Sequence, residues 1–236
     1  MLLAAIDVGN TRRHAALFAP TPAGVELVET RDEPDFKRWR APVADVVYAS
    51  VRPEGDRALE RALKSGWGLR AAKMGRDFPA ALRNRTRRPA QTGADRLADA
   101  FAAWRRCRRA CVVVDMGTAI TVNIVDGRGD FIGGAIAPGL ATMARSLHDG
   151  TSLLPLVSPQ PLADLGRDTR TAIRAGLYAA ARGVIGVGRH LVKGPARLFG
   201  TGGDARHFAP LFDEVVPHLT LEGIALSWLQ SRRRLR

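Results

Sequence analysis

Residues 2–11 read LLAAIDVGNT, and residues 111–120 read CVVVDMGTAI. Each stretch begins as a continuous apolar run, which is typical of a buried strand, and ends in an Asp-x-Gly turn. A second apolar strand, a turn and a third strand follow in both places. Because this order occurs twice, with Asp115 placed 108 residues after Asp7, the sequence predicts an internal duplication of a sheet-and-helix unit.

The rest of the pattern predicts an α/β protein. Apolar, β-branched runs predict strands at residues 2–6, 14–18, 25–29, 45–50, 111–114, 120–125, 131–132 and 196–199. Amphipathic or Ala-rich runs predict helices at residues 56–64, 96–106, 171–192 and 221–229. No Ser/Gly-rich linker separates the halves, so we expect two closely apposed domains, residues 1–109 and 110–236.

The charge of the chain is strongly positive. The net charge is +13, and 32 of the 36 basic residues are Arg. The Arg runs at residues 83–88, 105–109 and 232–236 have two interpretations: a patch for nucleic acid or anionic membrane, or solvated faces of an Arg-biased sequence. Only 6% of the residues are aromatic and none interleaves with the runs, which favours solvated faces and no nucleic-acid partner.

The sequence also indicates where in the cell the protein is found. The apolar N-terminal stretch stops at Asp7 without a basic segment before it, and no run approaches the roughly 20 apolar residues that span a bilayer. Cys107 and Cys111 are not part of a zinc-ligand pattern. We therefore expect a soluble cytoplasmic protein with free thiols, no structural zinc and no membrane partner.

The turn at residues 7–11 (DVGNT) can be a plain hairpin, since Asp, Gly and Asn are common in turns. It also suits phosphate binding, because Gly9 lets backbone N–H groups and the Asn10 and Thr11 side chains approach phosphate oxygens. The Asp7 carboxylate suits Mg²⁺. The copy at residues 115–118 (DMGT) favours the phosphate-binding interpretation.

Residues 93–96 read GADR and open a predicted helix. Asp95 can be a helix cap beside a solvated Arg96. Alternatively, a carboxylate kept ionised at a helix N-terminus can accept the proton of an attacking hydroxyl, and Arg96 can pair with an anionic group of the substrate.

Several common nucleotide-binding folds are excluded because their sequence motifs are absent from this chain. The chain has no Gly-x4-Gly-Lys-[Ser/Thr], no His-Arg-Asp or Asp-Phe-Gly, and no Gly-x-Gly-x-x-Gly after its first strand. The two hairpins and the turn at residues 200–203 (GTGG) resemble instead the actin/hexokinase/Hsp70 superfamily. That resemblance implies duplicated actin-like (ribonuclease H-like) domains with an interdomain ATP cleft.

A more specific resemblance covers nearly the whole chain. The motifs DVGNT (7–11), GADR (93–96), VDMGTA (114–119), GGAIAPG (133–139), TGG (201–203) and LTLEG (219–223) together resemble the type III pantothenate kinases. The resemblance implies ATP-dependent phosphorylation of pantothenate, the first step of coenzyme A biosynthesis. It also implies a homodimer whose active site lies at the subunit interface.

The resemblance assigns roles to single residues of this chain. ATP would be bound by Asp7, Val8, Gly9, Asn10, Thr11, Arg12, Thr118, Gly202 and Gly203. Asp7 would hold Mg²⁺, and Asp115 would hold an activating K⁺ or NH₄⁺. Asp95 would be the general base. The acceptor pocket would comprise Thr86, Gly93, Ala94, Asp95 and Arg96, with Thr169 reaching pantothenate from the partner subunit.

The chain departs from the family pattern at several positions, and residues 86–89 read TRRP where the family commonly has Tyr and then Asp-Asn-Pro. Thr86 stands where the family commonly has a Tyr that covers pantothenate, and Thr cannot supply that apolar face. Asp168 and Met116 replace a frequent Asn and Phe. Two other functions therefore stay open: a different small-molecule kinase of the superfamily, and a non-catalytic, nucleic-acid-associated regulator on the same scaffold.

Overall fold

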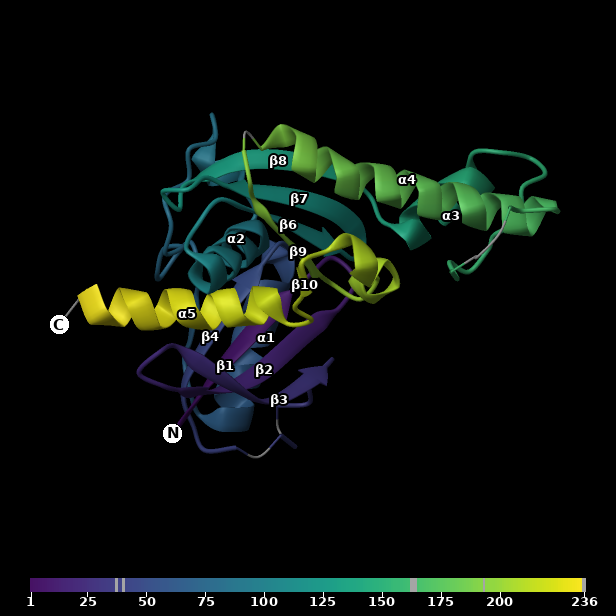
Figure 1. Ribbon diagram of the computed structural model, residues 1–236. Coiled ribbons are helices and arrows are strands. Elements are labelled where there is room, and N and C mark those ends of the chain that lie inside the picture. The colour runs from purple at the N-terminus through teal and green to yellow at the C-terminus, as the bar shows by residue number, and fades with distance from the viewer. Residues whose placement is uncertain (37, 40, 162–164, 193, 235–236) are drawn as a thin grey trace. The chain divides into compact units, whose positions relative to one another are not determined.

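The computed structural model describes residues 1–36, 38–39, 41–161, 165–192 and 194–234, and it divides into two compact units (Figure 1). The first unit comprises Met1–Arg106, Gly129–Phe131 and the chain from His218 onward; the second comprises Cys107–Arg128 and Ile132–Pro217. The chain first passes from the first unit to the second between Arg106 and Cys107, close to the predicted boundary between residues 109 and 110. The C-terminal segment differs from that prediction, because it belongs to the first unit.

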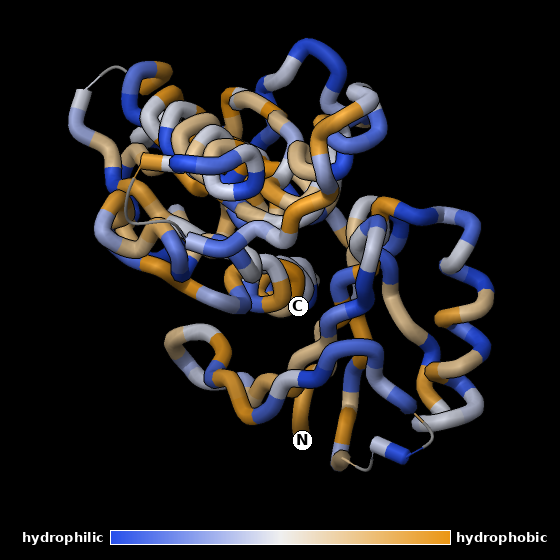
Figure 2. The backbone as a smooth tube through the Cα atoms, turned by 90° about the vertical axis from the view of Figure 1, so that its right-hand side faces the viewer, coloured by the Kyte–Doolittle hydropathy of each residue, from blue (hydrophilic) through white to orange (hydrophobic). Residues whose placement is uncertain are grey.

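The first unit is built on a five-stranded sheet in the order β3-β2-β1-β4-β5. Its strands are β1 (Leu2–Val8), β2 (Arg13–Pro20), β3 (Val25–Asp32), β4 (Val43–Ser50) and β5 (Ala71–Lys73). β1 pairs antiparallel with β2 and parallel with β4. In Figure 2 the tube next to the N-terminal label, which is β1, is mostly orange, as expected for a central strand whose two faces are buried.

Helices cover both faces of this sheet. Leu3 and Ala5 point to the face that packs with α2 (Ala94–Cys107) and α5 (Leu219–Arg234), whereas Ala4 and Ile6 point to the face of α1 (Pro53–Trp67). α5 supplies buried Leu221, Ile224 and Ala225 to the α2 face. Burying a Leu or Ile side chain contributes roughly 1.5–3 kcal/mol, so these contacts stabilise the packing of α5 on this face.

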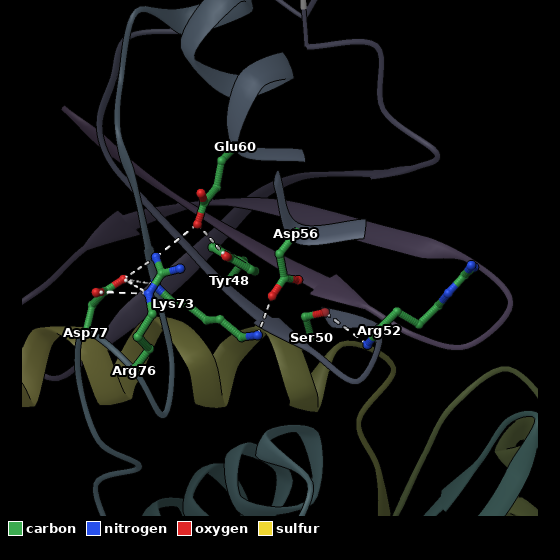
Figure 3. Close-up of polar contacts among 8 residues, drawn as sticks. All are labelled: Tyr48, Ser50, Arg52, Asp56, Glu60, Lys73, Arg76 and Asp77. Atoms are coloured by element: carbon green, nitrogen blue, oxygen red, sulfur yellow. Dashed lines mark hydrogen bonds and ion pairs between the residues drawn. The ribbon is translucent and has the colours of Figure 1, made fainter. Parts of the chain in front are cut away.

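A polar network fastens α1 to the other side of the sheet (Figure 3). The Tyr48 hydroxyl and the Arg76 guanidinium both donate to the Glu60 carboxylate, at 2.7 and 2.9 Å. These bonds, the Tyr48 one above all, hold the pKa of Glu60 below its usual range. Lys73, at the end of β5, forms a largely buried ion pair with Asp56 in the first turn of α1. The network fixes the ends of β4 and β5, next to the end of β1.

The second unit contains the other five-stranded sheet, in the order β10-β9-β6-β7-β8. Its strands are β6 (Cys111–Met116), β7 (Ala119–Val125), β8 (Phe131–Pro138), β9 (Arg197–Thr201) and β10 (Glu214–Val215). Its helical segments are α3 (Leu140–Asp149), α4 (Thr169–Leu191) and the 3-10 segment η2 (Ala205–Leu211). β6 pairs antiparallel with β7 and parallel with β9, as β1 pairs with β2 and β4.

The repeated topology confirms the predicted duplication and the actin-like fold class. The strands extend one to six residues beyond the runs that predicted them. In β1 and β6 the added residues include Asp7 and Asp115, which join the hydrogen-bond ladders although they are polar. Elements too short or too mixed for a periodic signal were not predicted: α3, β5, β10, η2 and the 3-10 turn η1 (Pro89–Gln91).

Two further predictions can be compared with the described residues. Cys107 and Cys111 are free thiols where α2 ends and β6 begins, as expected, and burial raises the pKa of the Cys111 thiol. None of the helices in the described ranges is long and apolar enough to cross a bilayer. Of the C-terminal Arg run, residues 235–236 lie outside the described residues.

Candidate functional site

The first predicted phosphate-binding turn is the β1–β2 hairpin. Asp7 pairs with His14 near the end of the ladder, and the Gly9 N–H donates to the Arg12 carbonyl at 3.0 Å. Asn10, Thr11 and Arg12 form the exposed tip, whereas Asp7 is partly buried. Strand alternation places Asp7 on the same face of the sheet as Ala5, which is the face covered by α2.

Residues that the sequence did not single out hold this hairpin. Arg52, between β4 and α1, donates from Nη1 to the Asn10 carbonyl at 3.3 Å. Its own N–H donates to Ser50 Oγ at 3.1 Å, a contact drawn in Figure 3, and the Val51 N–H donates to the Val8 carbonyl at 3.1 Å. The parallel pairing of β1 with β4 brings these residues together, which no local pattern could reveal.

Asp95 lies in the first turn of α2, as predicted, and is mostly buried. Desolvation raises the pKa of its carboxyl group above the usual value, although the N–H and charge of Arg96 oppose the shift. Asp95 Oδ1 accepts that N–H at 2.8 Å. A carboxylate whose pKa is raised towards the working pH is suited to accept a proton, so the base interpretation fits this environment.

The position of the Asp95 carboxylate requires a glycine at residue 93. A Cβ atom at Gly93 would lie 2.3 Å from Asp95 Oδ1, so Asp95 could not keep its position beside any other residue. Arg96 is partly buried, and its guanidinium lies 5.5 Å from the centre of the Phe131 ring. It is therefore not the solvated Arg of the capping interpretation. Thr86 lies in the loop before α2, where its hydroxyl bonds to side chains of that loop.

The LTLEG motif fastens α5 to α2. A Cβ atom at Gly223 would lie 2.0 Å from the Ala98 carbonyl oxygen, so the two helices touch through their backbones. The Thr220 hydroxyl donates to Asp99 at 2.7 Å, and Arg106 donates to Glu222 at 2.5 Å. The motif therefore sets the position of the helix that begins at Asp95. Arg106, which belongs to the Arg run at residues 105–109, is therefore part of an ion pair and not of an open basic patch.

In the second unit, the structure brings together Asp115 and the glycine turn after β9. Asp115 pairs with Thr201 in the parallel β6–β9 ladder. Gly202 has φ +84°, and a Cβ atom there would lie 2.4 Å from Asp115 Oδ1 and 2.6 Å from the Met116 carbonyl oxygen. Gly203, by contrast, has open space at its Cβ position. Gly202 thus permits the close contact with Asp115, and Gly203 leaves room beside it.

The start of α3 holds the β6–β7 hairpin through hydrogen bonds to its backbone. The Thr118 carbonyl accepts the Gly139 N–H at 3.0 Å and the Thr142 hydroxyl at 2.7 Å. A Cβ atom at Gly139 would lie 2.0 Å from the Gly117 carbonyl oxygen. The GGAIAPG motif therefore ends in a glycine because β8 must pass into α3 against this hairpin, which leaves the tip of Thr118 exposed.

Thr169 lies elsewhere in the second unit, as the first residue of α4. Asp168 caps this helix by accepting the Thr171 N–H at 2.9 Å, while its own N–H donates to the Thr171 hydroxyl at 3.1 Å. Thr169 lines an apolar pocket of about 720 Å³ between α3 and α4. The other lining residues are Pro138, Met143, Ser146, Leu147, Leu154, Ala172, Ile173, Gly176, Leu177 and Ala180.

The residues present suit a metal carried by a nucleotide. Among the residues that the structure describes, no three His, Cys, Asp or Glu side chains gather into a metal-binding group. Mg²⁺ commonly uses one or two carboxylates together with substrate phosphates, so the single Asp7 carboxylate beside a phosphate-binding hairpin fits that ion. Asp115, beside the backbone oxygens of its hairpin, offers a second oxygen site.

Comparison with known sequences gives a family match. The family model for type III pantothenate kinases matches residues 3–188. A type III pantothenate kinase of Nitratidesulfovibrio vulgaris is 42% identical over 170 residues, which cover 67% of this chain and 64% of that protein. One from Desulfovibrio desulfuricans is 38% identical over 198 residues, covering 79% of this chain and 75% of the relative.

Comparison with solved structures supports the fold. A Campylobacter jejuni protein described as a Baf family transcriptional activator aligns over 99% of this chain and all of that one, with a TM-score of 0.67 and 20% identity. The Listeria monocytogenes protein Lmo2764, described as an N-acetylmannosamine kinase, aligns over 98% of this chain and all of that one, with a TM-score of 0.50 and 15% identity. At these identities the likeness concerns the fold alone.

Proposed function

The chain belongs to the type III pantothenate kinase family, and we propose that it transfers the γ-phosphoryl group of ATP to the hydroxyl group of pantothenate, the first step of coenzyme A biosynthesis. The observation that carries the proposal is the mostly buried Asp95 at the start of α2, inside the part of the chain that matches the family. The family match disfavours both a different superfamily kinase and a non-catalytic regulator. We propose a cytoplasmic enzyme.

In the proposed reaction Asp95 accepts the proton of the attacking hydroxyl group. Gly93 lets the carboxylate keep its place, and Arg96 lies next to it to pair with the carboxylate of pantothenate. Phosphoryl transfer depends mainly on positioning and on neutralising charge, so a fixed carboxylate with a raised pKa is well suited to orient the hydroxyl.

ATP would be bound by the β1–β2 hairpin (residues 8–12), by Thr118 and by the turn at Gly202 and Gly203. Mg²⁺, held by Asp7, would neutralise charge on the phosphates. We propose that Asp115 holds an activating monovalent cation, K⁺ or NH₄⁺. Its carboxylate lies against Gly202 and next to backbone oxygens, which are ligands suited to such a cation.

A direct assay tests the proposed function. ADP release should require pantothenate when ATP, Mg²⁺ and K⁺ are present, and it should fall when Na⁺ replaces K⁺. Turnover that is equal with and without pantothenate would contradict the acceptor, and a panel of small alcohols and sugars would then identify another. Steeply salt-dependent DNA binding without turnover would instead favour the regulator.

We further propose a homodimer in which Thr169 reaches pantothenate of the partner subunit. The apolar pocket beside Thr169 supports this, since a partner subunit would cover the apolar side chains that line it. Nearby apolar side chains are also exposed: Leu153 is 91% exposed, and Leu147, on the pocket wall, is 37% exposed.

Leu147→Glu should convert the dimer into a monomer, because it places a charge in the apolar contact. Sedimentation velocity at micromolar concentration measures the change, and the KM for pantothenate should rise as Thr169 of the partner is lost. Leu27→Glu, on β3 and 44% exposed, is the control and should remain dimeric. A wild-type protein that sediments as a monomer would overturn the proposed assembly.

A further inference from the structure

Three side chains in the loop before α2 form a closed ring of hydrogen bonds. The Thr86 hydroxyl donates to Asn84 Oδ1 at 2.9 Å, and Asn84 Nδ2 donates to Thr92 Oγ1 at 3.0 Å. Thr86 and Thr92 are joined through their hydroxyl oxygens at 3.2 Å. Because the Thr86 proton is used by Asn84, the Thr92 hydroxyl is the donor in this last contact. Each group therefore both donates and accepts.

Backbone contacts extend the ring on both sides. The Thr86 N–H also donates to Asn84 Oδ1 at 3.0 Å, and Asn84 Nδ2 donates to the Pro89 carbonyl at 3.2 Å. The strand-like segment that enters the loop pairs with Phe131, through the Arg85 N–H at 2.8 Å and the Arg83 carbonyl at 2.8 Å. These backbone hydrogen bonds therefore hold the segment that carries the ring in place. Such mutually polarised hydrogen bonds hold a loop more firmly than separate ones.

The ring ends directly beside the proposed base. Thr92 is bonded covalently to Gly93, and the Cα atom of Gly93 lies so close to the Asp95 carboxylate that a Cβ atom would come within 2.3 Å of Oδ1. Any shift of the Thr92 backbone therefore moves the surface against which Asp95 rests. The Thr86 side chain is turned towards its own loop, where its hydroxyl both donates and accepts a hydrogen bond.

We propose that Thr86, with Asn84 and Thr92, is a positioning residue that holds Asp95 in place through Gly93. This inference rests on the proposed function for its kinetic consequence, but the bracing of the loop can be measured without substrate. It assigns a role to one of the positions at which the chain departs from its family: the Thr86 hydroxyl orders the loop, whereas an aromatic ring would cover the acceptor.

The test replaces the hydroxyl group by a methyl group of similar size. Thr86→Val should lower kcat about 10-fold, because small misplacements of a catalytic group are costly, while the KM for ATP stays within about twofold. Thr86→Ser restores the hydroxyl and should recover most of the activity. As water enters the loosened loop, the pKa of Asp95 should return towards its ordinary value, so the acid limb of the kcat–pH profile should move to lower pH.

A second variant and a readout without substrate complete the test. Thr92→Val opens the same ring and should match Thr86→Val, and the double variant should be no worse than either single one. In the substrate-free protein, both should exchange the backbone amide protons of residues 84–96 about 10-fold faster. The control Thr21→Val removes a hydroxyl that accepts the Gly24 N–H at 3.1 Å in the β2–β3 turn, and it should change neither readout.

The possible failures are distinguishable. If the wild type shows no pantothenate-dependent turnover, the proposed function fails, and amide exchange still decides whether the ring braces the loop. If wild-type turnover is present but Thr86→Val changes neither kcat nor exchange, the positioning role is overturned. It is equally overturned if Thr86→Ser is as impaired as Thr86→Val, since the hydroxyl group would then not be the cause.

Discussion

Asp95→Asn is expected to lower kcat by roughly 10²–10⁴, the range for loss of a positioned general base. The substitution keeps an oxygen that can accept the Arg96 N–H, now at 2.8 Å from Asp95 Oδ1, so the start of α2 should keep its geometry. ADP release with saturating pantothenate measures the loss. Asp126→Asn, in the β7–β8 turn, is the matched control and should retain wild-type turnover. A loss of less than about threefold would exclude Asp95 as the base.

The raised pKa of Asp95 has consequences for pH dependence. The ionised carboxylate is the base, so kcat should fall as the pH is lowered through this raised pKa. The stability of the folded protein changes with pH in the opposite direction. A group whose pKa is higher in the folded state favours folding when protonated, so ionised Asp95 costs stability at neutral pH. Asp95→Asn should therefore unfold at a higher temperature than the wild type at pH 7, and this difference should shrink at low pH.

Gly202→Ala is expected to destabilise the second unit and to abolish nucleotide binding. The new Cβ would meet Asp115 Oδ1 at 2.4 Å and the Met116 nitrogen at 2.7 Å, in a backbone conformation with φ +84°. Left-handed backbone and overpacking against a main chain together cost about 2–4 kcal/mol, which corresponds to roughly 5–15 °C in melting temperature for a chain of this size. Thermal unfolding and ATP titration measure the two effects.

Gly203→Ala is the matched control for this substitution. Its Cβ would enter open space, so the melting temperature should remain that of the wild type. If ATP is bound at this turn, as the proposed function holds, the KM for ATP should nevertheless rise. Equal loss of stability in the two variants would contradict the distinction drawn between the two glycines. An unchanged KM in Gly203→Ala would place the nucleotide elsewhere.

Local sequence was sufficient for the parts of this protein that depend on local physics. Continuous apolar runs predicted the central strands, and the repeated Asp-x-Gly turn predicted the duplicated sheets. The helix that opens at GADR was predicted from its periodicity, with Asp95 in its first turn. The small residues Gly176, Gly183, Gly186 and Gly188 in the Ala-rich run at residues 171–192 predict close packing of that helix. Of these four, only Gly188 has close neighbours at its Cβ position, with Val112 at 2.9 Å, because composition does not tell which side of α4 meets the sheet.

Tertiary structure alone decided which distant segments support the site. α5 returns to the first sheet, and Gly223 packs against Ala98, because its apolar side chains complete the α2 face. Arg52 reaches the first hairpin through the parallel pairing of β1 with β4. The Thr86 ring needs a loop folded back on itself. The sequence by itself determined that residues such as Gly202 and Gly203 lie in a turn. Only the fold distinguished them, since a local pattern records whether a residue is apolar, polar or flexible, but not which atoms come to lie beside it.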